Sequence, residues 1–140
     1  MDSIPEKKIA AELNTQYTVK EYYFMNLYSH PTDVVFAGDS ITAYCPWNEL
    51  YPELSVKNRG IGSDSTTCLL SRLDSIIKTE PSKIFIMIGV NDFAYGYSVE
   101  EAYQNYLMII VKKRTSEYGN LYTVMPSMLL KLFKMESSNC

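Results

Sequence analysis

This sequence has very little histidine, and it has no basic block and no long apolar run. Its 140 residues include one histidine, His30, so a serine nucleophile later in the chain has no histidine after it to accept a proton. The 13 basic and 16 acidic side chains give a net charge of −3, which offers nucleic-acid binding little electrostatic support. No apolar run reaches the length of a membrane-spanning helix, and Met1 to Lys8 lack the apolar core of a signal peptide. We therefore expect neither nucleic acid nor a membrane as a partner.

The cysteines are few and odd in number. The three thiols, Cys45, Cys68 and Cys140, show no metal-ligand spacing and cannot all pair within one chain. We interpret them as reduced thiols of a cytoplasmic protein, and no metal site is predicted.

Length and composition fit one ordinary globular domain. The hydrophobic fraction is 46% and the charged fraction is 21%. A chain of 140 residues is long enough to bury a core, and it contains no repeat, low-complexity tract or linker. We expect a single domain over residues 1–140.

Helix and strand patterns alternate along the chain. The predicted helices cover Asn14–Ser29, the apolar stripe Leu69–Ile77 before Pro81, and a segment from the capping box of Ser98 and Glu101 to Gly119. The first predicted strand begins at about Asp33, and the other three cover Leu54–Asn58, Lys83–Ile88 and Leu121–Met125. An apolar tail, Ser127–Cys140, follows the last strand. Strands separated by helices indicate an α/β fold in which a parallel sheet has helices on both faces.

Two of the predicted strands end abruptly in polar, glycine-flanked residues. The run that begins at Val34 stops at Gly38-Asp39-Ser40, and the run that begins at Ile84 stops at Gly89-Val90-Asn91-Asp92. Right-handed crossovers bring the carboxyl ends of parallel strands to one edge of a sheet, where open α/β folds place their chemistry. The two clusters are therefore expected to share one site.

The residue types at this edge suit a serine nucleophile. A serine hydroxyl needs a base that takes its proton and donors that stabilise the resulting oxyanion. Ser40 lies in a tight turn before a segment that can begin a helix, and the loop at Gly62 and Ser63 offers backbone N–H groups. Asn91 offers a neutral side-chain amide donor. Ser40, Gly62, Ser63 and Asn91 are the candidate catalytic residues.

Two acidic residues accompany these candidates, and each has two interpretations. Asp39 either acts as a catalytic acid or caps the following turn of helix. Asp92 either takes part in catalysis or binds loop amides, and the structural role is the more plausible for it.

Three sequence blocks, taken in order, resemble a known family. VVFAGDSIT, NRGIGSDST and IMIGVNDF are similar to the first three blocks of the SGNH (GDSL) hydrolases, and the resemblance runs from about Asp33 to Pro126. It implies a flavodoxin-like α/β/α three-layer sandwich and a hydrolase of acyl or acetyl esters that needs no cofactor. It also implies that Ser40 is the nucleophile and supplies one oxyanion-hole N–H, and that Asn91 is the oxyanion-hole asparagine.

The sequence departs from the family pattern in two places. Ser63 stands where the second block commonly has glycine, so the backbone donor belongs to Ser63, or to Gly62 if the loop shifts by one residue. A serine fits there only if its φ is negative or mildly strained. The last family block, Asp-x-x-His, has no match, so the domain is expected to be shortened after its fourth strand.

His30 cannot replace the missing histidine within one chain. It precedes the first strand and Ser40 follows that strand, which separates them by about 25 Å at the rise of an extended chain.

Three interpretations of the function remain open. The chain is a working SGNH-type esterase whose base comes from elsewhere, such as a partner chain; a degenerate family member that keeps the fold and oxyanion pocket, turns over little and at most binds a small ligand; or an unrelated flavodoxin-like domain with a chance Gly-Asp-Ser.

The fourth predicted strand suggests self-association. If the sheet ends at Leu121–Met125, the outer edge of this strand presents unpaired backbone groups, which invite pairing with another chain. We therefore expect a homo-oligomer that acts on a small-molecule ester.

Overall fold

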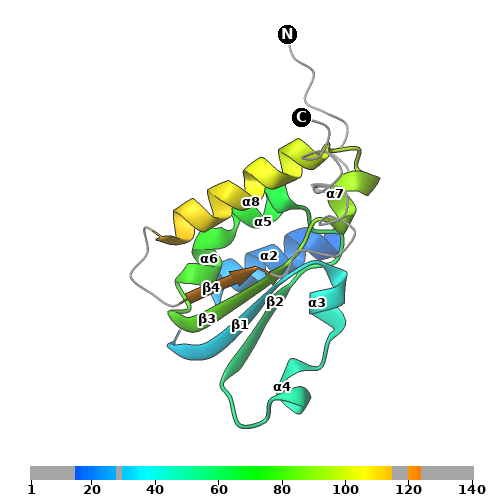
Figure 1. Ribbon diagram of the computed structural model, residues 1–140. Coiled ribbons are helices and arrows are strands. Elements are labelled where there is room, and N and C mark those ends of the chain that lie inside the picture. Colours follow the sequence, from blue (N-terminus) through cyan, green and yellow to red (C-terminus); the bar gives the residue numbers. More distant parts are fainter. Residues whose placement is uncertain (1–14, 28–29, 115–119, 124–140) are drawn as a thin grey trace.

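Four parallel strands form the centre of the described chain. The computed structural model describes residues 15–27, 30–114 and 120–123 (Figure 1). The strands are β1 (Thr32–Gly38), β2 (Val56–Gly60), β3 (Pro81–Met87) and β4 (Asn120–Thr123), and they pair in the order β2-β1-β3-β4. This is the flavodoxin-type order, in which the chain adds β2 on one side of β1 and then crosses to add β3 on the other.

Helices connect the strands. They are α2 (Thr15–Asn26), α3 (Ser40–Tyr44), α4 (Trp47–Leu50), α5 (Thr66–Ser71), α6 (Leu73–Ile77), α7 (Val90–Ala94) and α8 (Val99–Arg114). The longer helices α2 and α8 lie with α5 and α6 along one side of the sheet, and the short helices α3 and α4 lie beside β1 and β2 (Figure 1). The fold is a shortened α/β/α sandwich, as predicted.

The main core lies on the sheet face that α5, α6 and α8 cover. Alternate residues of β1 and β3 point into it, because side chains alternate between the two faces of a strand. Val35 and Ala37 stand opposite Ile84 and Ile86 in the register of the sheet, and all four are fully buried. Their helical partners are aliphatic or aromatic and are also buried: Leu69, Leu73, Ile76, Tyr106 and Ile109.

The other face of the sheet is aromatic. Phe36, Phe85 and Tyr122 are register partners on β1, β3 and β4, and their rings stack at centroid distances of 5.3 and 5.1 Å. Trp47 of α4 lies flat on Phe36 at 3.7 Å. Tyr122 remains 43% exposed, so the cover that α3 and α4 give to this face stops short of β4.

Several predicted boundaries differ from those observed. The predicted strand Leu54–Asn58 lies two residues later, and the predicted helix over Leu69–Ile77 is divided into α5 and α6 at Arg72, whose φ of −103° and ψ of 7° leave the helical region. Pro81 does not follow a helix end directly; it is the first residue of β3 and pairs with Thr32.

Other predicted features match the structure where it describes them. The capping box is confirmed, with Ser98 N–H donating to Glu101 Oε2 and Glu101 N–H to Ser98 Oγ.

The predicted tail Ser127–Cys140 lies outside the described residues, as do Gly119 and the end of the predicted fourth strand. Within the described ranges, we find no helix with the length and apolar character needed to span a bilayer.

Candidate active site

The carboxyl ends of β1, β2 and β3 lie level with one another. Gly38, the last residue of β1, is the register partner of Gly60 at the end of β2 and of Met87 at the end of β3. Ile61 N–H continues this alignment by donating to Gly38 O at 2.9 Å. The three loops that carry the candidate residues therefore leave the sheet at one edge, and β1 and β3 flank the point where the strand order reverses.

Two glycines let α3 lie close against this edge. A Cβ on Gly38 would stand 2.1 Å from Met87 O and 2.5 Å from Thr42 Oγ1, and one on Gly60 would stand 2.3 Å from Ala43 N. Asn58 completes the contact, since its Nδ2 donates to the carbonyls of Thr42 and Ala43. Helix α3 is thereby held against both β1 and β2.

Ser40 is the first residue of α3, and Asp39 is its N-cap. Asp39 Oδ1 accepts from Ile41 N–H at 3.0 Å, which confirms the capping interpretation. Asp39 is 1% exposed, and burial raises the pKa of its carboxyl. Because the cap binds Ile41, the backbone N–H of Ser40 keeps no acceptor among the described residues.

The loop after β2 adopts an unusual backbone conformation at Ser63. Its φ of 64° lies in the left-handed region, which glycine adopts freely and other residues adopt at a cost of about 1 kcal/mol. Of the two conditions under which a serine fits this position, a negative φ or a mildly strained one, the structure shows the second. Within the described ranges, the N–H groups of Gly62 and Ser63 donate to no protein acceptor.

Helix α7, which follows β3, binds this loop through several side chains. Asn91 Nδ2 donates to Asp64 O at 2.9 Å, and Tyr95 Oη donates to Ser63 O at 2.8 Å. An amide nitrogen carries two hydrogens, so Asn91 keeps a second one for another acceptor. Asn91 and the Ser63 loop are thus brought together directly.

Asp92 binds the start of α5. Its carboxylate accepts from the N–H of Thr66 at 3.0 Å and from the Thr66 hydroxyl, and it is fully buried. Burial raises its pKa, while the bonds from Thr66 oppose the rise. The structural role expected for Asp92 is confirmed.

A buried ion pair connects the loop to β1. The Asp64 carboxylate accepts from Arg72 Nε at 3.1 Å and Nη2 at 2.5 Å, and Nη2 also lies 3.4 Å from Gly38 O. Both side chains are fully buried. Burial raises the pKa of Asp64 to about 6, against the opposing effect of the Arg72 charge.

Comparison with known proteins identifies the family. The model of the GDSL-like lipase/acylhydrolase family matches residues 36–131, which include the second and third sequence blocks and the first block from Phe36 onward. The chain belongs to this family. The resemblance of the Gly38-Asp39-Ser40 and Asn91 blocks to SGNH hydrolases is thereby confirmed.

Relatives of this GDSL-family chain include proteins that are longer than it is. Platelet-activating factor acetylhydrolase IB subunit alpha1 of Bos taurus is 35% identical over 75 residues, which cover 49% of this chain and 32% of the bovine protein. A solved structure from Streptococcus pneumonia, named for platelet activating factor, matches with a TM-score of 0.67 at 30% identity. That match covers 84% of this chain and 56% of the other. This chain therefore spans about a third of the bovine protein and just over half of the Streptococcus protein.

A more distant likeness supports the fold of the family alone. The psychrotrophic esterase EstA of Pseudoalteromonas sp. matches with a TM-score of 0.58 at 18% identity, and the match covers 77% of this chain and 73% of EstA.

The histidine expected to be remote is remote. His30 is exposed and precedes β1, whereas Ser40 follows the other end of that strand. Its Nδ1 lies 3.0 Å from the neighbouring Pro31 O, and Lys57 Nζ donates to its carbonyl. In the part of the chain that the structure describes, the Ser40 hydroxyl forms no hydrogen bond, so no base is in contact with it.

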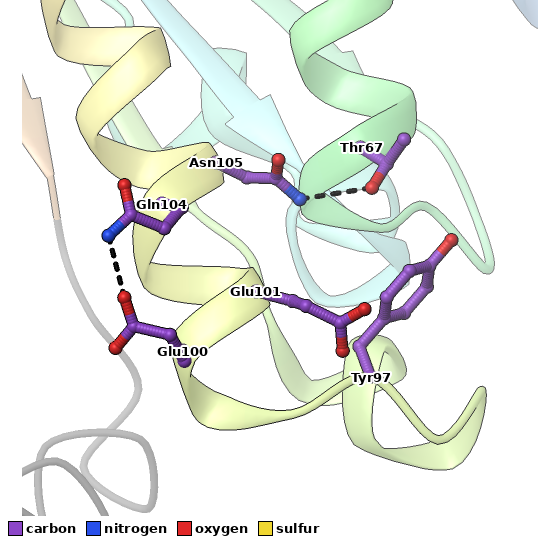
Figure 2. Close-up of a pocket in the computed structure, with 6 residues that line it drawn as sticks. All are labelled: Thr67, Tyr97, Glu100, Glu101, Gln104 and Asn105. Atoms are coloured by element: carbon purple, nitrogen blue, oxygen red, sulfur yellow. Dashed lines mark hydrogen bonds between the residues drawn. The ribbon is translucent and has the colours of Figure 1, made fainter.

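A hollow of about 300 Å³ lies between the starts of α5 and α8 (Figure 2). Its polar side chains bind one another: Asn105 Nδ2 donates to Thr67 Oγ1, and Gln104 Nε2 donates to Glu100 Oε1. None of the four candidate catalytic residues lines it. The bond of Asn105 to Thr67 holds α8 against α5, and the hollow lies outside the site.

The described ranges offer no group of three or more His, Cys, Asp or Glu side chains that is placed to hold a metal ion. Cys45 and Cys68 are free thiols, and Cys140 lies outside those ranges.

Sequence reasoning missed two residues that organise this edge. Tyr95 joins α7 to the Ser63 loop, and Arg72 joins the Asp64 loop to β1. Neither carries a motif: Tyr95 is one of 12 tyrosines, and Arg72 interrupts an apolar stripe that reads as one helix. The meeting of Ser40 with Asn91 in one pocket stays a prediction.

Proposed function

We propose that this chain carries the nucleophile and the oxyanion-binding groups of a serine ester hydrolase that acts on short acyl or acetyl esters. The observation that carries the proposal is the level alignment of Gly38, Gly60 and Met87. Ser40, the Gly62 and Ser63 loop and the Asn91 helix follow these strand ends at one edge of the sheet, which supports a shared site.

The donors at this edge suit a developing negative charge. The N–H groups of Ser40 and Ser63 have no described acceptor, and Asn91 has one amide hydrogen left over. Neutral donors that are fixed before the reaction stabilise an oxyanion without having to reorganise. The name of one relative, an acetylhydrolase, agrees with ester chemistry.

The reaction takes two steps. Ser40 Oγ attacks the ester carbonyl carbon, loses its proton, and forms a tetrahedral intermediate whose oxyanion is bound by these donors. The intermediate expels the alcohol, which takes up a proton, and leaves an acyl group on Ser40. Water then attacks this acyl-enzyme and releases the carboxylic acid and the free serine.

The proton acceptor determines the rate. This sequence contains no second histidine, and His30 is at the opposite end of β1. With water as the acceptor, catalysis rests on oxyanion stabilisation and substrate binding, which retain roughly 10³- to 10⁴-fold over the uncatalysed reaction in other serine hydrolases. Hydrolysis by this chain alone is therefore slow.

Hydrolysis of p-nitrophenyl acetate and butyrate tests the proposal. We expect slow release of p-nitrophenol by the wild type and background release by Ser40→Ala. Asn91→Ala should lower the rate at least tenfold, because one oxyanion donor contributes about 10²- to 10³-fold. Ser82→Ala, at an exposed position at the other end of the sheet, is the matched control. Equal rates for wild type and Ser40→Ala would overturn the proposal.

A second candidate function is the binding of a small ligand without turnover. The absence of a hydrogen bond between the Ser40 hydroxyl and any described base favours it. Calorimetric titration with butyrate, whose carboxylate oxygens resemble the oxyanion, distinguishes the two. Binding by wild type and Ser40→Ala that is lost in Asn91→Ala, together with no Ser40-dependent hydrolysis, would identify a binding module.

A further inference from the structure

The strained backbone at Ser63 is fixed from both sides of one peptide group. The peptide between Ser63 and Asp64 donates its N–H to Ile61 O at 3.3 Å, and its carbonyl, Ser63 O, accepts from Tyr95 Oη at 2.8 Å. The Ile61 contact is a long bond within the turn itself. Among the described residues, the tyrosine hydroxyl is the one group of another element that binds the Ser63 carbonyl.

This tie opposes the relaxation that a serine would otherwise undergo. The left-handed region has ψ near +50°, whereas the β region has ψ near +135° and the right-handed region near −40°. If Ser63 left its φ of 64° for either region, its carbonyl would turn away from Tyr95. The hydroxyl thus stabilises the one backbone conformation that serine disfavours.

The conformation of Ser63 sets the direction of its own N–H group. A change of φ at Ser63 rotates the peptide between Gly62 and Ser63, and Gly62 offers little resistance, because glycine has no Cβ to restrict its backbone. A relaxed Ser63 would therefore point its N–H away from the present direction. Tyr95 controls that direction through Ser63.

Tyr95 also links this N–H group to Asn91. The two side chains are four residues apart on α7 and its C-cap, so they lie on the same side of the helix. One binds Ser63 O and the other binds Asp64 O. Helix α7 thus holds a side-chain donor and a backbone donor in a fixed relation.

The geometry points to Tyr95 as a positioning residue that holds the Ser63 N–H in the orientation needed for the oxyanion. This inference rests on the proposed function, because the Ser63 N–H has a catalytic role only in a serine hydrolase. Tyr95 itself does not touch the reacting atoms; it acts through the Ser63 backbone.

Steady-state hydrolysis of p-nitrophenyl butyrate by Tyr95→Phe tests it. Removal of the hydroxyl alone should lower kcat about five- to fiftyfold, less than the loss of a complete oxyanion donor, with KM within about twofold of the wild type. Tyr22→Phe, at an exposed position on α2, should match the wild type.

Ser63→Gly provides the discriminating rescue. Glycine adopts a φ of 64° without strain. The clamp, which is the hydrogen bond from Tyr95 Oη to Ser63 O, therefore has less to hold in place. In the Ser63→Gly background, Tyr95→Phe should lower kcat by less than about twofold. An equal loss in both backgrounds would mean that Tyr95 acts in another way and would overturn the inference.

A second readout separates this inference from the proposed function. The three-bond HN–Hα coupling and the chemical shifts of Ser63, measured by NMR, report its φ whether or not the chain hydrolyses esters. If the wild type shows no Ser40-dependent hydrolysis, the proposed function fails, while a change of the Ser63 signals in Tyr95→Phe still supports the clamp. Ser63 signals that are unchanged in Tyr95→Phe would overturn the clamp.

Discussion

At the scale of single residues, Gly38 decides how closely β1, β3 and the start of α3 approach one another. Any larger residue there would meet Met87 O, a backbone atom within the sheet that cannot rotate away. Gly62 is the opposite case, since the space around it is open. Two glycine positions of the same candidate site therefore differ in whether they have room for a larger side chain.

The first prediction compares these two glycines. Gly38→Ala should lower the free energy of unfolding by about 3 kcal/mol or more, because the methyl group forces the sheet and α3 apart. Gly62→Ala should change it by less than about 1 kcal/mol. Urea denaturation measures both. Equal effects would contradict the close approach of Met87 and Thr42 to Gly38.

Asp64 gives a prediction about pH. Its pKa is raised from 3.8 to about 6 in the folded chain, so between these pH values the folded chain holds a proton that the unfolded chain has released. The stabilisation of the folded state by this bound proton is complete below about pH 4 and is lost as the pH rises through 6. We expect the contribution of Asp64 to the free energy of unfolding to fall by on the order of 2 to 3 kcal/mol over this range.

Asp64→Asn removes this titration. Its free energy of unfolding, measured in urea at several pH values from 4 to 7, should depend less on pH than that of the wild type. The exposed Asp74→Asn is the matched control and should keep the wild-type slope. A slope in Asp64→Asn as steep as in the wild type would assign the pH dependence to other groups, such as the buried Asp39 and Asp92.

At the scale of elements, helix α7 organises the edge of the sheet by binding the loop after β2. It is five residues long, yet Asn91, Asp92 and the C-cap Tyr95 each bind a different residue of the segment from Ser63 to Thr66. A helix this short has little stability of its own, so its position depends on these bonds. Helix and loop therefore form one unit.

Asp92→Ala tests this unit. It leaves the buried N–H and hydroxyl of Thr66 without their acceptor, which should lower the free energy of unfolding by about 2 to 3 kcal/mol. Asp74→Ala removes an exposed pair with Lys112 and should cost less than about 1 kcal/mol. Chemical denaturation of the two variants gives the comparison. A loss in Asp92→Ala no larger than in Asp74→Ala would exclude the structural role of Asp92.

The sequence predicted the order of the elements because apolar spacing and strand-ending glycines are local signals. It did not predict the break between α5 and α6, because the apolar stripe continues through Leu69, Leu73 and Ile76. The break arises at Arg72, whose buried side chain reaches Asp64 and Gly38 O, contacts that no local pattern contains. The start of β2 was misplaced for a similar reason, since its register with β1 sets it.

The candidate site was predictable to the extent that it follows strand ends. Ser40 and Asn91 follow β1 and β3 as expected, and Asp39 and Asp92 have structural roles, each of which is one of the two interpretations that the sequence allows. The contact of Tyr95 with Ser63 was not predictable, because it joins residues 32 positions apart through one hydroxyl.

At the scale of the whole molecule, apolar surface is distributed over several elements. Exposed apolar side chains gather on α2 and on the outer face of α8: Val19, Tyr22, Tyr23, Met25, Leu107, Met108 and Val111. No strand within the described ranges pairs with the outer edge of β4, where Tyr122 is also exposed. Surface of this kind is typical of association sites.

We therefore expect the 16.0 kDa chain to form a homodimer or a higher oligomer through the edge of β4 or the adjoining helical face. Light scattering at micromolar concentration measures its mass. Tyr122→Lys, which puts a charge on the edge strand, should shift the mass toward the monomer, whereas Tyr44→Lys at an exposed position on α3 should not. A stable wild-type monomer of about 16 kDa would contradict this expectation.

A crystal structure of the chain after reaction with a p-nitrophenyl alkylphosphonate tests the central claim most directly, because the phosphonyl oxygen stands in for the oxyanion. We predict a bond from phosphorus to Ser40 Oγ, with a phosphonyl oxygen within about 3 Å of Asn91 Nδ2 and of the N–H of Ser63 or Gly62. A structure in which Ser40 Oγ lies more than about 8 Å from the Asn91 side chain would contradict it, since one oxyanion could not contact both groups.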